Sequence, residues 1–177
     1  MKKHVLMMSG SIACAKATGL ISEWVKKGDE VQVIASQAAL QFIGEATLEG
    51  LSQKPVMTDT FEKGDMMAHI HVSRWADDII LCPATANTIN KLAAGIADDV
   101  LTTSWVAAHG LGKPMLVIPA MNSMMWKYPA TQEAIKKLVA WGIDVMPTAE
   151  GDLACGEQGA GRLPEVVDIL AYLDSKT

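Results

Sequence analysis

Short apolar runs alternate along the chain with longer segments in which apolar residues recur at helical spacing. The runs carry no polar alternation, which is typical of strands covered on both faces. Strands are predicted at residues 4–8, 31–35, 78–82, 115–118 and 143–147. Helical spacing is found in residues 13–28, 38–43, much of 83–110, 129–142 and 164–175.

This alternation predicts an α/β fold. Because crossovers between parallel strands are right-handed, it indicates a doubly wound, mainly parallel, Rossmann-like sheet with helices on both faces. The length of 177 residues favours a single domain over residues 1–177. Residues 52–68 are the least regular stretch and are expected to form a mobile loop.

Composition narrows the class of partner. Half of the residues are apolar and the formal charge is −5, which argues against disorder and against nucleic-acid binding. No apolar stretch approaches the roughly 20 residues of a membrane helix, so we expect a cytoplasmic protein with a small-molecule partner. Cys14, Cys82 and Cys155 are odd in number and widely spaced, which argues against disulfides and against a zinc site.

In doubly wound sheets, ligands bind beyond the carboxyl ends of the strands. The residues that follow these ends are small or carry hydroxyls. A glycine with flanking serines before a helix favours a phosphate. The pattern is neither GxGxxG nor GxxxxGK[ST], so a mononucleotide such as FMN is favoured, although the serines would also serve as simple helix caps. The predicted cofactor residues are Gly10, Ser11, Ile12, Ser36, Thr85, Ala86, Asn87, Thr88 and Ala120.

Residues 119–126, PAMNSMMW, place an asparagine among methionines directly after an apolar strand. A buried amide without a partner costs about 1–3 kcal/mol, so Asn122 should have a use. One use is as the N-cap of a helix. The other is a contact with a ligand.

Three segments together resemble the flavin-dependent cysteine decarboxylases. PAMNSMMW fits their PxMNxxMW signature, AHIHVSRWADDIILCPATAN resembles the segment that leads into their flavin loop, and LACGEQGAGR resembles their substrate flap. The family includes enzymes for phosphopantothenoylcysteine and for lantibiotic peptides. The resemblance implies bound FMN, no metal, and a homotrimer or a dodecamer built of trimers.

The resemblance also implies the chemistry. The substrate ends in a cysteine with a free carboxylate, which has no electron sink beside it. Oxidation of the thiol carbon to a thioaldehyde creates that sink, so that loss of CO₂ gives an enethiolate, and the cofactor carries the redox steps.

By resemblance, His69 is a base or positioning group, Asn122 holds the substrate carboxylate and the decarboxylated intermediate, and Cys155 delivers a proton when the enethiolate is reduced. Arg74, Met125 and Ala154, with Asn122, are the expected substrate contacts. For Arg74, a solvated side chain is nearly as good an interpretation.

Other polar residues are given structural roles. Cys14 and Cys82 fit core positions, and His71 falls on a variable motif position. Adjacent aspartates do not share a face, so Asp77, Asp78, Asp98 and Asp99 are expected to cap helices or pair with neighbours.

The expected substrate is 4′-phosphopantothenoylcysteine, and the expected product 4′-phosphopantetheine for coenzyme A synthesis. The alternatives are a decarboxylase of peptides with a C-terminal cysteine and, ranked lower, a non-catalytic flavin-binding regulatory subunit. The cysteine of the flap favours the first. The chain is either a standalone protein or part of a ligase–decarboxylase.

Overall fold

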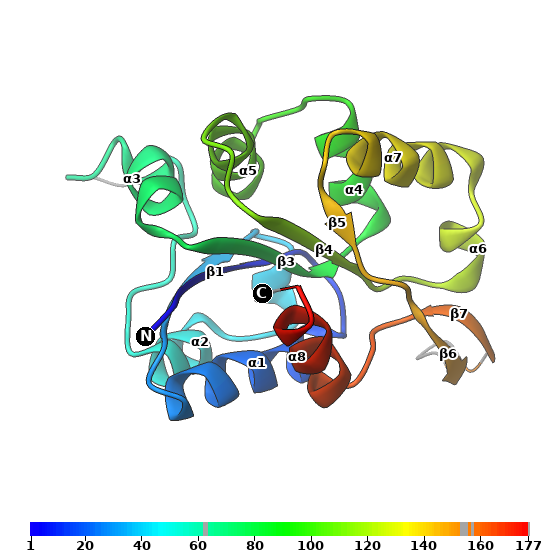
Figure 1. Ribbon diagram of the computed structural model, residues 1–177, viewed down its shortest axis with the longest axis horizontal. Coiled ribbons are helices and arrows are strands. Elements are labelled where there is room, and N and C mark those ends of the chain that lie inside the picture. Colours follow the sequence, from blue (N-terminus) through cyan, green and yellow to red (C-terminus); the bar gives the residue numbers. More distant parts are fainter. Residues whose placement is uncertain (62–63, 153–155, 157, 177) are drawn as a thin grey trace.

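The computed structural model describes residues 1–61, 64–152, 156 and 158–176. Its main sheet has five parallel strands in the order β2-β1-β3-β4-β5, as the alternation of elements predicted (Figure 1). The strands are β1 (Lys3–Met8), β2 (Glu30–Ala35), β3 (Asp78–Ala84), β4 (Met115–Pro119) and β5 (Asp144–Val145).

Helices cover both faces of the sheet, which makes the fold doubly wound (Figure 1). One face carries α1 (Cys14–Lys26), α2 (Glu45–Ser52) and α8 (Val166–Asp174). The other face carries α3 (Ala68–Trp75), α4 (Ala86–Ala93), α5 (Val100–Gly110) and α7 (Pro129–Ala140). The predicted fold class is therefore confirmed.

Side chains of each strand alternate between two apolar cores. In β1, Leu6 and Met8 pack with α1, whereas Val5 and Met7 pack against the opposite helix layer, and all four are fully buried. Because both faces are covered, the strands lack polar alternation. Burial of each such side chain stabilises the fold by about 1.5–3 kcal/mol.

Helix α1 shows how the sequence sets an element. Its buried residues Ala17, Leu20, Ile21 and Trp24 recur at helical spacing and face the sheet. The helix stops where Gly28 takes a positive φ of 84°, a conformation that glycine adopts without a Cβ clash.

Several boundaries differ from the prediction. The long helical segment predicted within residues 83–110 divides into α4 and α5, with Gly95 at a positive φ of 72° in the connection. Residues 38–43 form a 3₁₀ turn, η1 (Ala39–Gln41), and the strand at 143–147 is shortened to β5. The short helices α2 and α3 were not predicted, whereas α6 (Ser123–Trp126) is the helix that Asn122 was expected to cap.

An antiparallel hairpin of β6 (Ala149–Asp152) and β7 (Gln158–Arg162) stands apart from the main sheet (Figure 1). Its glycine-rich residues carry no strand signal. The stretch 53–67 contains no helix or strand in its described residues apart from an isolated bridge of Met57 to Ile34, in line with its irregular sequence.

Among the described residues, none of the helices combines the length and apolar character needed to cross a bilayer. In the same part of the chain, no group of three or more histidine, cysteine, aspartate or glutamate side chains is arranged to hold a metal ion.

Candidate active site

A cavity of about 510 Å³ lies at the carboxyl ends of the parallel strands. The strand order reverses between β1 and β3, so the loops after these strands diverge and leave a crevice. Its volume is in the usual range for a small-molecule site. The lining residues are Gly10, Ser11, Ser36, Gln37, Ala38, Thr58, Thr85, Asn87, Thr88, Lys91, Asp99, Ala120, Met121 and Met125.

Most of the predicted cofactor residues therefore meet in one cavity, although they come from four separate loops. Met125, a predicted substrate contact, lines the same space. Two predicted cofactor residues do not line it: the Ile12 side chain is largely exposed and Ala86 is buried.

Gly10 permits a close approach of the first loop to the turn after β2. A Cβ at this position would lie only 2.5 Å from the Cβ of Ala38. Any larger residue would push these two walls of the cavity apart.

The buried Ser9 hydroxyl joins the first loop to the third. It donates to the carbonyl of Pro83 at 2.7 Å and accepts from the backbone N–H of Thr85 at 2.9 Å. Both walls of the crevice are thus held by one side chain.

The hydroxyls of the loops cap helices and turns while they line the cavity. Thr85 is the N-cap of α4 and accepts from the N–H of Thr88 at 3.3 Å. The Ser11 hydroxyl accepts from the N–H of Ala13, and that of Ser36 from the N–H of Ala39. Helix N-termini directed at a common space favour an anion. Capping and ligand binding are therefore compatible here.

Sequence reasoning missed Gln37, Ala38, Thr58, Lys91, Asp99 and Met121. Thr58 reaches the cavity because the preceding residue, Met57, bridges to Ile34 near the end of β2. The carbonyl of Thr58 accepts from the side-chain amide of Gln37. No local pattern signals such a contact. Lys91 had a signal, because it lies four residues after Asn87 on one helix.

Asn122 is the N-cap of α6, and its side chain accepts from the N–H of Met124 at 2.7 Å. The structural interpretation of this amide is thus confirmed. Asn122 does not line the cavity, although Met121 and Met125 on either side of it do.

The hairpin is anchored beside Asn122. The N–H of Met121 donates to the carbonyl of Gly161 in β7 at 2.8 Å. Gly161 has a positive φ of 111°, and a Cβ there would collide with the carbonyl oxygen of Met121. Glycine is required for this contact.

His69 lies on α3, away from the cavity. Its Nδ1 is buried with no hydrogen-bond partner in the described part of the chain. Helices α3 and α6 lie at opposite ends of the molecule in Figure 1. One copy of the chain therefore does not bring His69 and Asn122 together.

The remaining residues of α3 include two at the surface. Arg74 has an exposed side chain and does not line the cavity, so within one chain it does not meet the other predicted substrate residues. His71 is exposed and pairs with Asp65 at 3.3 Å, in keeping with its structural assignment. On a helix, His69 and His71 point in different directions.

Two cysteines belong to the core. Cys14 and Cys82 are fully buried, and burial raises the pKa of each thiol. Raised pKa values disfavour the reactive thiolate, in agreement with their predicted packing roles. Cys155 and Ala154, the predicted proton donor and substrate contact, lie outside the described residues.

The adjacent aspartates have the predicted structural roles. Asp77 accepts from the N–H of Lys3, and Asp78 pairs with the Nδ1 of His4 at 2.7 Å. Asp98 pairs with Lys91, and Asp99 caps α5.

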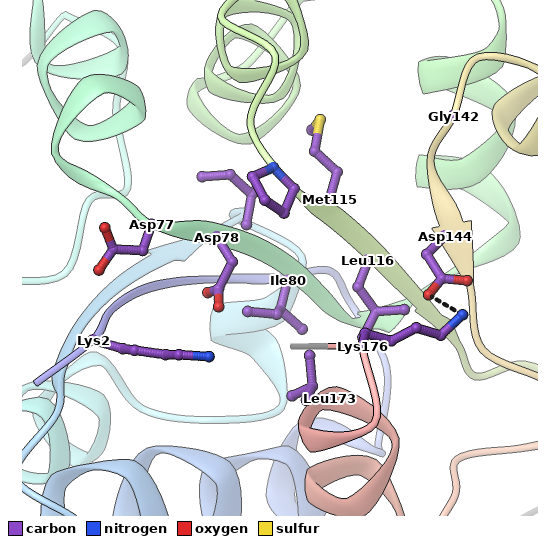
Figure 2. A pocket seen from close by; sticks show the side chains of 12 residues that line it. Lys2, Asp77, Asp78, Ile80, Met115, Leu116, Gly142, Asp144, Leu173 and Lys176 are labelled. Carbon is purple, nitrogen blue, oxygen red and sulfur yellow. Dashed lines mark ion pairs between the residues drawn. The ribbon is translucent and has the colours of Figure 1, made fainter.

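A second cavity, of about 410 Å³, lies at the amino ends of the strands, between the sheet and α8 (Figure 2). Its charged lining groups have partners in the chain, since Lys176 pairs with Asp144 at 3.0 Å and Asp78 pairs with His4. Apolar side chains of Ile80, Leu116 and Leu173 form much of its wall. We assign no ligand to it.

The Flavoprotein family model matches residues 1–177. The chain belongs to the Flavoprotein family. Among curated relatives, the coenzyme A biosynthesis bifunctional protein CoaBC of Bacillus subtilis (strain 168) is 44% identical over 168 residues, which cover 94% of this chain and 41% of that protein. The CoaBC protein of Vibrio vulnificus (strain YJ016) is 39% identical over 175 residues, which cover 98% of this chain and 43% of that protein.

This Flavoprotein chain therefore spans about two fifths of the length of the curated relatives it matches. A solved mutant of PPC decarboxylase complexed with pantothenoylaminoethenethiol superposes with a TM-score of 0.86 at 29% identity, covering 99% of this chain and 97% of that one. The FMN binding protein AtHal3 gives a TM-score of 0.82 at 30% identity, covering 99% and 96%.

Proposed function

We propose that the chain is an FMN-dependent decarboxylase that converts 4′-phosphopantothenoylcysteine into 4′-phosphopantetheine and CO₂. The observation that carries the proposal is the cavity at the strand ends, in which hydroxyl and amide side chains from four loops converge. The proposal is further supported by the similarity to CoaBC proteins and to a PPC decarboxylase over nearly the whole chain.

The lining of the cavity fits a flavin mononucleotide. Polar donors from Ser11, Thr85, Asn87 and Thr88 gather near the N-termini of α1 and α4, where a phosphate is favoured. Ala120, Met121 and Met125 supply apolar surface for a planar ring on another wall. When bound, FMN would supply the two-electron oxidation and re-reduction of the substrate's thiol carbon.

Asn122 would serve as a hydrogen-bond donor to the substrate. Its Oδ1 accepts from the N–H of Met124 at the start of α6, and only its amide nitrogen can donate to a carboxylate. A donor held in this way suits a carboxylate and the negative charge that develops when CO₂ leaves. His69 would take or hold the thiol proton.

These two roles require two copies of the chain. Because α3 and α6 lie at opposite ends of one copy, we propose that His69 of one copy faces the Asn122 region of the next (Figure 1). A head-to-tail contact of this kind closes into a ring such as a trimer. Larger assemblies of trimers, up to a dodecamer, would keep the same site.

The test is chemical. Purified protein should be yellow and should release CO₂ from 4′-phosphopantothenoylcysteine, with a product whose mass differs from that of the substrate by CO₂ alone. A product that has lost two further hydrogens would favour the peptide-type reaction, which stops at the enethiol. A folded protein that is colourless and takes up no FMN would overturn the proposal. The proposed cytoplasmic location would be checked by cell fractionation.

A further inference from the structure

Lys91 is the one positively charged side chain among the residues that line the active-site cavity, all of which lie in the described part of the chain. It lies on α4, three residues after Thr88 and four after Asn87. Helical geometry puts these three side chains on one face, and all three line the cavity. The α4 wall thus carries a cation one turn beyond its hydroxyl and amide groups.

The acidic lining residue has a structural role. Asp99 is the N-cap of α5, and its Oδ1 accepts from the N–H and the hydroxyl of Thr102 at 2.7 and 2.8 Å. Its charge is directed at the positive end of a helix. The role of Asp99 therefore does not account for the positive charge of Lys91.

The ion pair that Lys91 forms with Asp98 stabilises the fold too little to explain why a lysine occupies this position. Its Nζ lies 2.9 and 2.8 Å from the two carboxylate oxygens of Asp98, and the Asp98 side chain is 53% exposed. The Lys91 side chain is 27% exposed, and partly exposed pairs of this kind contribute little to stability. The backbone N–H of Asp98 donates to the Thr102 hydroxyl, and the next residue, Asp99, lines the cavity. A ligand that binds Lys91 must therefore compete with Asp98 for the ammonium group.

We propose that Lys91 binds the phosphate of the ligand and thereby selects a phosphorylated ligand over its unphosphorylated form. This inference rests on the proposed flavin binding. A phosphate carries more charge than a carboxylate and presents three acceptor oxygens, so it competes with Asp98 for the ammonium group. The hydroxyls of α4 fix the place of the phosphate, and Lys91 supplies the charge that riboflavin cannot use.

The experiment measures the dissociation constants of FMN and of riboflavin on the full chain, stripped of flavin, by quenching of flavin fluorescence. Lys91→Gln should weaken FMN binding by roughly tenfold to a hundredfold, the scale of a charge-assisted hydrogen bond, and leave riboflavin binding unchanged. Lys91→Arg should keep the preference for FMN. The matched control is Lys136→Gln, which removes the same charge from an exposed position on α7 and should change neither constant.

The outcomes separate this inference from the proposed function. If the wild-type protein binds neither FMN nor riboflavin, both the role of Lys91 and the proposed function are wrong. A wild-type protein that prefers FMN, with the same preference in Lys91→Gln, overturns the role of Lys91 and leaves the proposed function standing. Asp98→Asn gives a second test should Lys91→Gln not fold: it removes the competing carboxylate and should tighten FMN binding alone. Unchanged or weaker FMN binding in Asp98→Asn contradicts the inference.

Discussion

Gly161 links the hairpin to the active-site loop through a conformation that other residues rarely adopt. Its positive φ and the adjoining Met121 carbonyl leave no room for a Cβ. Gly112 also has a positive φ, of 68°, but has open space around it. The two glycines therefore separate the effect of backbone conformation from the effect of the close contact.

Gly161→Ala should destabilise the protein by about 3 kcal/mol or more, because it combines left-handed strain with a steric clash. It should also displace β7 from Met121 and lower turnover. Gly112→Ala, with strain alone, should cost about 1 kcal/mol and leave turnover unchanged. Urea unfolding and activity assays check both; equal losses in the two variants would contradict the importance of the contact.

Sequence reasoning at the residue scale succeeded where one local pattern carried the information. The glycine and hydroxyls after β1 and β3 were identified because strand ends face ligands in this class of sheet. Thr58 was missed because its place depends on a bridge between distant segments. The role of His69 was predicted from a motif and stays a prediction, and its separation from Asn122 within one copy is a property of the fold (Figure 1).

The α4 helix connects local capping with ligand binding. Thr85 caps it, and the same hydroxyl contacts that of Thr88 at 3.2 Å on the cavity wall. Loss of the hydroxyl should therefore affect both stability and affinity.

Thr85→Ala should lower the free energy of unfolding by about 1 kcal/mol, the usual value of an N-cap, and should weaken FMN binding. Thr85→Ser keeps the oxygen and should restore most of both. Thermal unfolding of the flavin-free protein and fluorescence titration measure the two effects. An alanine variant that loses neither stability nor affinity would show that the Thr85 hydroxyl is dispensable.

An acid-sensitive contact joins α1 to the start of α8. The Glu165 carboxylate accepts from Lys16 at 2.7 Å and from Arg162 at 2.9 Å. The hydrogen bond from Lys16 is the main cause that holds the pKa of Glu165 below its usual value. The folded protein therefore favours the ionised form.

Because the folded pKa lies below the unfolded one, Glu165 stabilises the protein above the unfolded value of about 4.3, and this contribution is lost as the pH falls through the folded value. Glu165→Gln should thus be less stable than wild type at pH 7, and the difference should disappear in acid. Urea unfolding across pH checks this. The exposed Glu133→Gln on α7 is the control and should show no such convergence.

At the scale of elements, the strands were the most predictable part, since a short, continuous apolar run between turn residues favours a buried strand over a helix. The helices α2 and α3 were missed because each has only eight residues, of which few are buried. The hairpin was missed because its sequence is rich in glycine and has no strand pattern. Only the hydrogen bonds between β6 and β7 define its two strands.

For the whole molecule, the decisive question is whether two copies share one site. The topology followed from the alternation of elements, but a contact between copies leaves no periodic signal in the sequence. The question of a shared site arises because α3 and α6 lie far apart within one copy (Figure 1).

His69→Asn and Asn122→Asp should each lower turnover by ~10²-fold or more. If the site is shared, mixed oligomers of the two variants contain some interfaces with both native residues. Co-expression should then restore about a quarter of wild-type activity, as random pairing at a head-to-tail interface gives. Co-expression of two differently tagged His69→Asn chains is the control. Mixed oligomers without recovery would contradict a shared site.

The Ser9 hydroxyl, which bridges Pro83 and Thr85, has a consequence for how the crevice can vary. One hydroxyl oxygen bonds both Pro83 and Thr85, so it joins the loop after β1 to the loop after β3. Neither loop can move apart to admit a wider ligand without breaking one of these buried hydrogen bonds. Variants evolved for bulkier ligands should therefore change lining residues that do not bond to Ser9, such as Gln37 and Thr58, before they change the loops that Ser9 joins.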